Sequence, residues 1–120
     1  MALFRRRRGA SNEPSRSERR EEVDGVRRHL EDFVRTRTGV EAFVEPATTV
    51  TPPTVLLVAQ SGEWTRRRVA DPALVRGLAR DLAVPVYDVQ LVGYPKRMRD
   101  WNDRQRAEAR RQANGGDQAG

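Results

Sequence analysis

The stretch TVLLVAQSGEWTRRRV, residues 54–69, determines the fold that we expect for this chain. Its first six residues are mostly apolar and partly β-branched, which is typical of a central strand covered on at least one face. The polar segment QSGE (60–63) then predicts a turn, and WTRRRV (64–69) predicts a returning strand. The stretch as a whole therefore indicates an antiparallel hairpin.

The residues before this hairpin predict a helix and a further strand. Ser15 and Glu18 have the spacing of a capping box, and apolar residues recur every three or four positions until Gly39. The segment VEAFVE (40–45) alternates with a period of two, which is typical of a half-buried strand. The prolines and threonines of residues 46–53 predict a loop.

The residues after the hairpin predict a second helix, a fourth strand and a third helix. Asp71 followed by Pro72 is a typical helix start, and a leucine at every fourth position then gives the helix one apolar face until Pro85. The segment VYDVQLV (86–92) alternates as a strand does, and Pro95 begins the last helix.

The predicted order of elements, α-β-β-β-α-β-α, indicates an α/β (α+β) two-layer sandwich. A helix between the third and fourth strands most simply makes these two strands parallel neighbours through a right-handed crossover. We therefore expect a mixed four-stranded sheet with the first two helices on one face. The single domain spans residues 15–102, between a disordered basic tail (1–14) and a projecting helix end with a disordered tail (103–120).

Composition and charge restrict the chemistry of the chain. It has 120 residues with no cysteine, which excludes disulfides, thiolate chemistry and Cys-ligated zinc. The apolar runs are too short to span a bilayer and the N-terminus does not resemble a signal peptide, so we expect a cytoplasmic protein. The net charge of +6 is concentrated at the two ends, with +3 in residues 1–22 and +3 in residues 96–120. The 22 arginines against one lysine are also what GC-rich codons produce.

No catalytic, metal or cofactor motif is present. The single histidine, His29, lies at the edge of the apolar stripe of the first helix, as boundary histidines do. Glu41 and Glu45 share a strand face about 13 Å apart, which exceeds the separation in glycosidase pairs, so we interpret them as charges on a half-exposed strand. The element order also resembles the core of metal-dependent nucleases, but TVLLVAQ (54–60) lacks their acidic residue and EWTRRRV (63–69) lacks their lysine. We expect no cofactor and no metal.

The third strand offers the first candidate binding surface. Alternation places Trp64, Arg66 and Arg68 on one face of that strand. An aromatic ring beside two guanidinium groups is what a surface that stacks bases and contacts phosphates uses. The same residues also form cation–π contacts among themselves, and arginines on an outer strand protect it from edge pairing. Both interpretations remain open.

The segment GYPKRMRDWNDRQR (93–106) offers the second candidate surface. Lys96, Arg97 and Arg99 are basic residues at the start of the predicted helix and are candidates for nucleic-acid contact. Three larger residues, at i, i+4 and i+7, form one apolar stripe that either packs on the domain or binds a partner; they are Tyr94, Met98 and Trp101.

The N-terminal segment offers a third, weaker candidate surface. The run Arg5 to Arg8 can attract polyanions without sequence specificity, and Leu3 and Phe4 beside it suit weak contact with an anionic membrane. A solvated tail without a partner explains the same composition equally well.

Four segments resemble a family of small, uncharacterised proteins from high-GC actinobacteria: GVEAFVEP (39–46), GEWTRRRV (62–69), VPVYDV (84–89) and GYPKRMRDWN (93–102). The resemblance covers about residues 39–102 and implies no functional residue. Some members carry a generic oxidoreductase label, which this sequence does not support because it has neither a G-x-G-x-x-G motif nor a cysteine. The order of the first five elements also matches the outline of double-stranded-RNA-binding domains, but their lysine cluster is missing at the start of the second helix.

The sequence therefore favours a small, basic, non-enzymatic protein that contacts RNA, DNA or a ribonucleoprotein. A protein–protein adaptor that uses the C-terminal helix is the alternative, and an enzyme of unrecognised chemistry is the third hypothesis.

Overall fold

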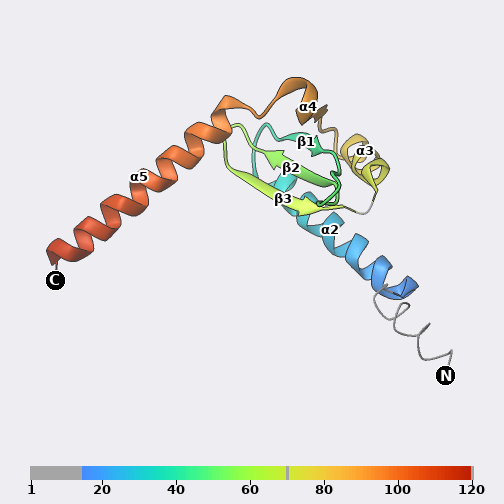
Figure 1. Cartoon of the computed structure of the whole chain (residues 1–120), viewed down its shortest axis with the longest axis horizontal. Helices are drawn as coiled ribbons and strands as arrows, with labels where there is room; N and C mark the ends of the chain where they lie inside the picture. The colour runs from blue at the N-terminus through green and yellow to red at the C-terminus, as the bar shows by residue number, and fades with distance from the viewer. Residues whose placement is uncertain (1–14, 70, 120) are drawn as a thin grey trace.

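The computed structural model of the chain describes residues 15–69 and 71–119 and has the element order that the sequence predicts (Figure 1). The N-terminal tail, for which we expected disorder and polyanion or membrane contact, lies outside the described residues. The elements are α2 (Arg16–Thr36), β1 (Glu41–Glu45), β2 (Thr54–Val58), β3 (Trp64–Arg68), α3 (Pro72–Asp81), β4 (Val86–Asp88), α4 (Val89–Val92) and α5 (Lys96–Ala119).

The helix starts follow from local capping. Ser15 accepts a hydrogen bond from the backbone of Glu18, and the Glu18 carboxylate accepts one from the backbone of Ser15, which confirms the capping box. Asp71 caps α3 by accepting from the backbone of Ala73. These contacts satisfy backbone N–H groups that a helix start otherwise leaves unpaired.

The four strands form one open mixed sheet in the order β3-β2-β1-β4. β2 pairs antiparallel with β3, as the hairpin predicts, and antiparallel with β1, while β4 pairs parallel with β1. The expectation that the third and fourth strands are neighbours is therefore wrong, although the two strands do run in the same direction. With β4 beside β1, the two apolar strands occupy the centre of the sheet and the arginine-rich β3 stays at an edge, where charged residues are tolerated.

The fourth strand is shorter than its alternating pattern predicts. Only residues 86–88 pair with β1, and the next four residues form the single-turn helix α4. The reason is local: the Asp88 side chain accepts a hydrogen bond from the backbone of Gln90 and caps the turn. The prediction of one strand over residues 86–92 is therefore wrong for its second half.

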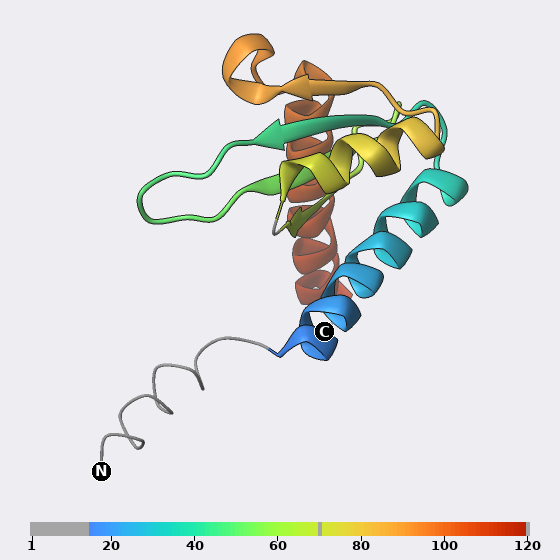
Figure 2. The same ribbon diagram turned by 90° about the vertical axis from the view of Figure 1, so that its right-hand side faces the viewer.

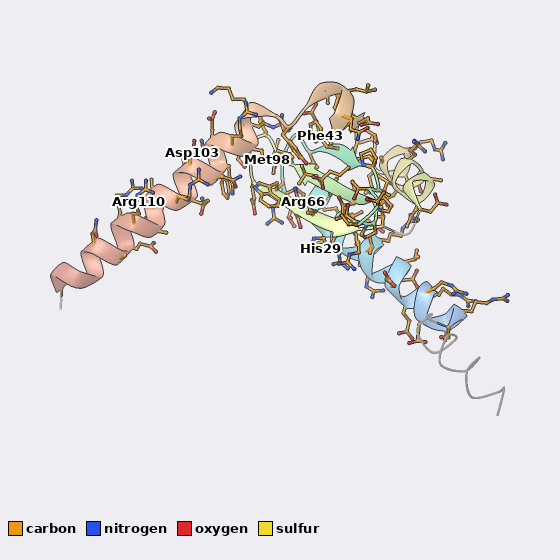
Figure 3. All side chains as sticks on the ribbon, viewed as in Figure 1. His29, Phe43, Arg66, Met98, Asp103 and Arg110 are labelled. Carbon is orange, nitrogen blue, oxygen red and sulfur yellow. The ribbon has the colours of Figure 1, made fainter. Side chains whose placement is uncertain are left out.

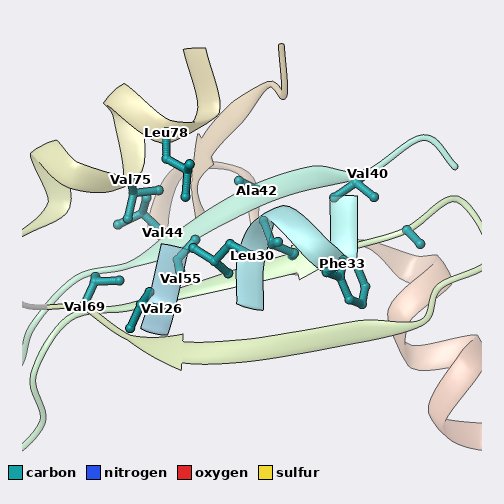
Figure 4. Close-up of a cluster of buried hydrophobic side chains, with 12 residues drawn as sticks. Val26, Leu30, Phe33, Val40, Ala42, Val44, Val55, Val69, Val75 and Leu78 are labelled. Atoms are coloured by element: carbon teal, nitrogen blue, oxygen red, sulfur yellow. The ribbon is translucent and has the colours of Figure 1, made fainter. Parts of the chain in front are cut away.

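Helices α2 and α3 cover one face of the sheet, as expected, and enclose the main core (Figures 2 and 4). The apolar stripe of α2 supplies its buried residues at spacings of three and four. The fully or nearly fully buried members of this cluster are Val26, Leu30, Phe33, Val40, Ala42, Val44, Val55, Leu57, Ala59, Val69, Val75 and Leu78.

The other face of the sheet carries a second, smaller core. Phe43, Leu56 and Val58 are buried there together with Met98 of α5, and the partly buried Trp64 packs against them. The centre of β1 is consequently buried on both faces and not on one face, as its alternation suggested. The difference arises because the first turns of α5 cover this face of the sheet (Figure 2).

Two helices extend away from the sheet. The first half of α2 and most of α5 project in different directions (Figure 1), and the Cα radius of gyration is 19.1 Å. A compact chain of this length has a radius of gyration of about 13.6 Å. α5 is continuous from Lys96 to Ala119, across the domain boundary expected after residue 102. Within the described residues, no helix combines the length and apolar character needed to cross a membrane.

Candidate nucleic-acid interface

The sheet face that contacts α5 carries three of the residues that the sequence selected, Trp64, Arg66 and Arg68, and the others among the described residues lie on α5 or just before it. We call this sheet face the α5 face. Strand register places on it side chains from all four strands, namely Glu41, Phe43, Glu45, Thr54, Leu56, Val58, Trp64, Arg66, Arg68 and Tyr87. Its centre is apolar and its two ends are charged, so its chemistry depends on how those charges are paired.

Trp64 is held in place on several sides. Its ring packs against the second core, its Nε1 donates a hydrogen bond to Asn102 Oδ1 at 2.8 Å, and the Arg66 guanidinium lies 5.2 Å from its ring centroid. Because one polar edge and one ring face are already in contact with the protein, little of this indole is free to stack on a nucleobase.

Arg66 is bound within the protein. Its Nε and Nη2 donate to the two oxygens of Glu45 at 2.7 and 3.0 Å, in the bidentate geometry that guanidinium groups favour. Glu45 also accepts from Thr54 Oγ1 at 2.5 Å and from the Tyr94 hydroxyl. A carboxylate offers about four acceptor positions, so these four hydrogen bonds use the whole acceptor capacity of Glu45.

The protonation of this cluster follows from those contacts. Burial raises the pKa of Glu45, but the hydrogen bonds from Arg66, Thr54 and Tyr94 outweigh it and leave that pKa below its ordinary value. The hydrogen bond to Glu45 raises the pKa of Arg66 and, with burial, the pKa of Tyr94. The cluster therefore holds one carboxylate, one guanidinium and one neutral phenol at neutral pH.

An open groove of about 380 Å³ lies beside this cluster. It is lined by hydroxyl, amide and apolar side chains, including Thr48, Thr51 and Gln90. A carboxylate whose acceptor positions are all occupied is neither a free general base nor a ready ligand for a cation. The described residues contain no group of three or more histidine, aspartate or glutamate side chains that could hold a metal.

Arg97 anchors α5 to the opposite end of the α5 face. Its Nη2 donates to Glu41 Oε1 at 2.6 Å, and its Nε donates to the backbone oxygen of Ala59 at 2.9 Å. Glu41 also accepts from the hydroxyl of Tyr87 at 3.2 Å. Each glutamate of β1 therefore binds one arginine and one tyrosine, so both charges on this partly exposed strand are paired.

The apolar stripe of the last helix is used mainly inside the protein. Met98 is 7 % exposed and points from α5 toward the sheet (Figure 3). Trp101 is partly buried, with the Arg104 guanidinium 5.8 Å from its ring centroid. Arg104 in turn donates to the backbone oxygen of Ser61 at 2.8 Å. Tyr94 remains 42 % exposed, with its hydroxyl bound to Glu45.

Four of the six basic or aromatic candidates are exposed, and three of these, unlike Arg66, have no ion pair to another element of the described chain. Arg68 is exposed and has no ion pair within the described chain. Lys96 pairs with Asp100 at 3.1 Å, but its side chain is 78 % exposed. Arg99 is exposed, and its Nη1 lies 3.4 Å from the backbone oxygen of Tyr94. These three side chains can reach a phosphate without breaking a buried contact.

His29 has the boundary position that its spacing predicts. Its Nε2 is hydrogen-bonded to Thr65 Oγ1 at 2.7 Å. Burial, followed by the charge of Arg67, lowers the pKa of His29 and favours the neutral ring. Its contacts account for it as a packing residue.

The projecting half of α5, residues 103–115, is a basic surface that sequence reasoning did not select. Every residue in it is exposed except Ala107, which is partly buried. Arg106 pairs with Asp103 and Arg111 pairs with Glu108, whereas Arg110 has no ion pair in the described part of the chain (Figure 3). Between residues 96 and 115, α5 carries seven basic and three acidic residues. The sequence signal for this exposed helix end was that no apolar residue larger than alanine follows Trp101.

Comparison of this chain with protein-family models, with curated proteins and with solved structures finds no match. The functional argument therefore rests on the geometry and charge described above.

Proposed function

We propose that this chain is a non-enzymatic protein that binds nucleic acid, free or within a ribonucleoprotein, through helix α5. One observation carries the proposal: a helix seated firmly on the sheet extends a long, exposed and basic end into solvent (Figure 1). A helix end with no apolar face gains nothing from packing on an apolar surface, but its arginines can replace the counterions of phosphates.

The contact surface of this proposal keeps the basic C-terminal end that the sequence favoured and leaves out the strand face of Trp64 and Arg66. Trp64, Arg66 and Arg97 contribute by holding α5 in place, since their polar groups are bound within the protein. The phosphate contacts come from exposed arginines of α5, namely Arg99, Arg106, Arg110 and Arg111. Four such contacts give a slope of about −3 to −4 for the logarithm of affinity against the logarithm of salt concentration.

The test is fluorescence anisotropy with labelled DNA and RNA at two salt concentrations. Arg106→Ala with Arg110→Ala should weaken binding by at least about tenfold and flatten the salt slope by about two. The matched control is Arg76→Ala with Arg80→Ala, which removes the same charge from exposed positions of α3. Equal effects of the two double variants would show that only overall charge matters and would contradict a role for α5.

A protein adaptor is the second candidate function, and the surface around α4 favours it. Leu91 is 84 % exposed, Val92 is 56 % exposed, and Tyr87 of the edge strand β4 is 37 % exposed. The sequence placed the binding surface of an adaptor on the apolar stripe of α5, but Met98 of that stripe is buried. A protein partner would therefore bind at these exposed residues around α4. Association that persists at high salt and is lost in Leu91→Ser would favour this candidate over nucleic acid.

A further inference from the structure

We infer that the nucleic acid is duplex DNA, and that residues 103–115 of α5 lie in its major groove. This inference rests on the proposed function and adds the class of ligand to it. It is carried by the shape of the free helix, by the distribution of arginines around it, and by the absence, within residues 15–69 and 71–119, of an array of free aromatic rings on which bases could stack.

The shape of the projecting helix fits one groove well. Its thirteen residues, 103–115, extend about 20 Å, and a helix with its side chains is about 10–12 Å across. The major groove of B-form DNA, about 12 Å wide, admits such a helix. The major groove of A-form RNA is deep and narrow, and side chains do not reach its base edges. No other part of the described chain lies beside this helix end to obstruct a duplex (Figures 1 and 2).

The arginines lie on two flanks of the helix. At about 100° per residue, Arg106 and Arg110 fall on one side of a line through Ala107, and Arg104 and Arg111 fall on the other. The two flanks are about 130° apart around the axis. Asn114 and Asp103 lie about 20° and 40° from the line through Ala107, so a small side chain, an amide and a carboxylate paired with Arg106 occupy the middle. A helix in a major groove meets phosphates of both strands at its flanks and base edges at its middle.

Three of the four flanking arginines, Arg106, Arg110 and Arg111, are available to phosphates, whereas Arg104 already donates to the backbone oxygen of Ser61. The pairs Arg106 with Asp103 and Arg111 with Glu108 join neighbouring turns on an exposed helix, and the two arginine side chains are 64 % and 68 % exposed. Exposed pairs of this kind are weak, so phosphate oxygens can replace the carboxylates as partners.

The described residues offer no array of free aromatic rings for single strands. Recognition of single-stranded nucleic acid relies on aromatic rings on which bases stack. Trp64 is held by Asn102 and Arg66, Trp101 has Arg104 over its ring, and Tyr87 stacks on Phe43 with a centroid distance of 5.4 Å. Tyr94 is 42 % exposed, but its hydroxyl is bound to Glu45 and it precedes the projecting helix. After Trp101, α5 contains no aromatic residue. Duplex DNA is therefore the class that the surface fits.

The experiment measures anisotropy of the full chain with four labelled 20-mer probes of matched sequence: duplex DNA, duplex RNA, single-stranded DNA and single-stranded RNA. The informative pair of variants is Ala107→Leu and Ala109→Leu. Both keep charge and helix propensity, but the first places bulk on the side that faces the groove and the second on the opposite side. Circular dichroism of both variants checks that the fold is unchanged.

The inference predicts that duplex DNA binds at least about tenfold more tightly than the other probes, and that Ala107→Leu alone weakens it by about tenfold. Equal binding of duplex RNA or a single strand, or equal effects of the two variants, overturns the assignment of the groove and leaves the proposed function standing. Absence of binding to all four probes overturns both.

Discussion

At the scale of single residues, the protein fixes its charged side chains by pairing them across the sheet. Glu45 shows this best, since one carboxylate receives hydrogen bonds from a strand arginine, a strand threonine and the tyrosine that precedes α5. The cluster joins β1, β2 and β3 to the connection before α5. The charge state of this cluster therefore affects both the stability of the sheet and the position of α5 on it.

Glu45→Gln should lower the free energy of unfolding by roughly 1–3 kcal/mol, because the amide cannot accept all four hydrogen bonds and leaves Arg66 without its counter-charge. Urea denaturation measures the loss. Glu21→Gln is the control, since Glu21 is exposed and outside this cluster. A loss no larger than that of the control would show that the cluster contributes nothing to stability.

The same cluster predicts how stability depends on acid. The pKa of Glu45 is lower in the folded state than its ordinary value of 4.5, so below pH 4.5 the unfolded chain takes up the proton first. The stabilisation is present above about pH 4.5 and is lost as pH falls through the folded pKa. The difference in unfolding free energy between the wild type and Glu45→Gln should therefore shrink below pH 4.5. A difference that stays constant down to pH 3 would contradict this origin.

At the scale of elements, α5 is held by a close approach of backbones. Gly62, in the turn between β2 and β3, has a φ of +96°, and a Cβ built there would lie 2.0 Å from the backbone oxygen of Arg97. No side chain is compatible with that position unless α5 moves. The hairpin turn and the helix are therefore fitted to each other through one glycine.

Gly62→Ala should destabilise the protein and unseat α5, at a cost of about 2–4 kcal/mol. Gly39→Ala is the matched control: its φ is +63°, but the atom nearest to its added Cβ is the Cβ of Gln60 at 3.1 Å and not a backbone atom of α5, so it should cost about 1–2 kcal/mol. Thermal unfolding gives the costs. Tryptophan emission should shift to the red only in Gly62→Ala, because Trp101 lies beside Gly62 and Trp64 is bound to Asn102 of α5. Similar spectra for both variants would contradict the role of Gly62 in holding α5.

Helices and strands with a clear periodicity of apolar residues were predictable from the sequence, but the order in which the strands pair in the sheet was not. The stripe of α2 and the hairpin of residues 54–69 follow from local spacing. The pairing of β4 with β1 depends on which edge of the sheet is best left exposed, and no local pattern near Val86 encodes that choice. The helix α4 arises because capping by Asp88 prevails over the alternation around it.

The candidate site was predictable to a similar extent. Alternation placed Glu41 and Glu45 on one strand face and Trp64 and Arg66 on another, but only the register of β1 against β2 and β3 shows that these faces coincide. The apolar stripe of Tyr94, Met98 and Trp101 indicated that the last helix packs against something, but it did not indicate against which surface. Because α5 docks there, a sheet face expected to bind a ligand is occupied by the chain itself.

At the scale of the whole molecule, both faces of a small sheet are covered by helices, and α5 is much longer than the few turns that pack on the sheet. The principal extents are 65 × 41 × 27 Å, and the longest one includes the projecting helices (Figure 1). In the described chain, no hydrogen bond, ion pair or buried contact links α5 beyond Arg104 to the sheet. Stability and binding should therefore be separable.

Deleting residues 107–120 should leave the unfolding free energy within about 0.5 kcal/mol of the full chain, because no packed contact is lost. The same deletion should reduce the radius of gyration measured by small-angle X-ray scattering and abolish tight binding to DNA. Deleting residues 1–14 is the comparison: it removes a net charge of +3, whereas residues 107–120 carry two arginines and two acidic residues and no net charge. A larger loss of binding from the C-terminal deletion would therefore not come from net charge. A large drop in melting temperature on removing residues 107–120 would show that the helix end folds back in solution.

Because α5 is held only near its start, a small tilt there produces a large displacement at its far end. Its seat consists of a few contacts near Arg97 and Met98, whereas its far end lies about 36 Å away along 24 residues. A tilt of about 10° at the seat would move the tip by about 6 Å, close to one helical turn. The positions of the distal arginines therefore depend on the contacts that hold the start of α5: the ion pair of Arg97 with Glu41, the burial of Met98, the close approach at Gly62 and the hydrogen bonds of Arg97, Asn102 and Arg104 to the hairpin of β2 and β3. Substitutions at Glu41 or Gly62 should consequently change where Arg110 can reach without touching the helix end itself.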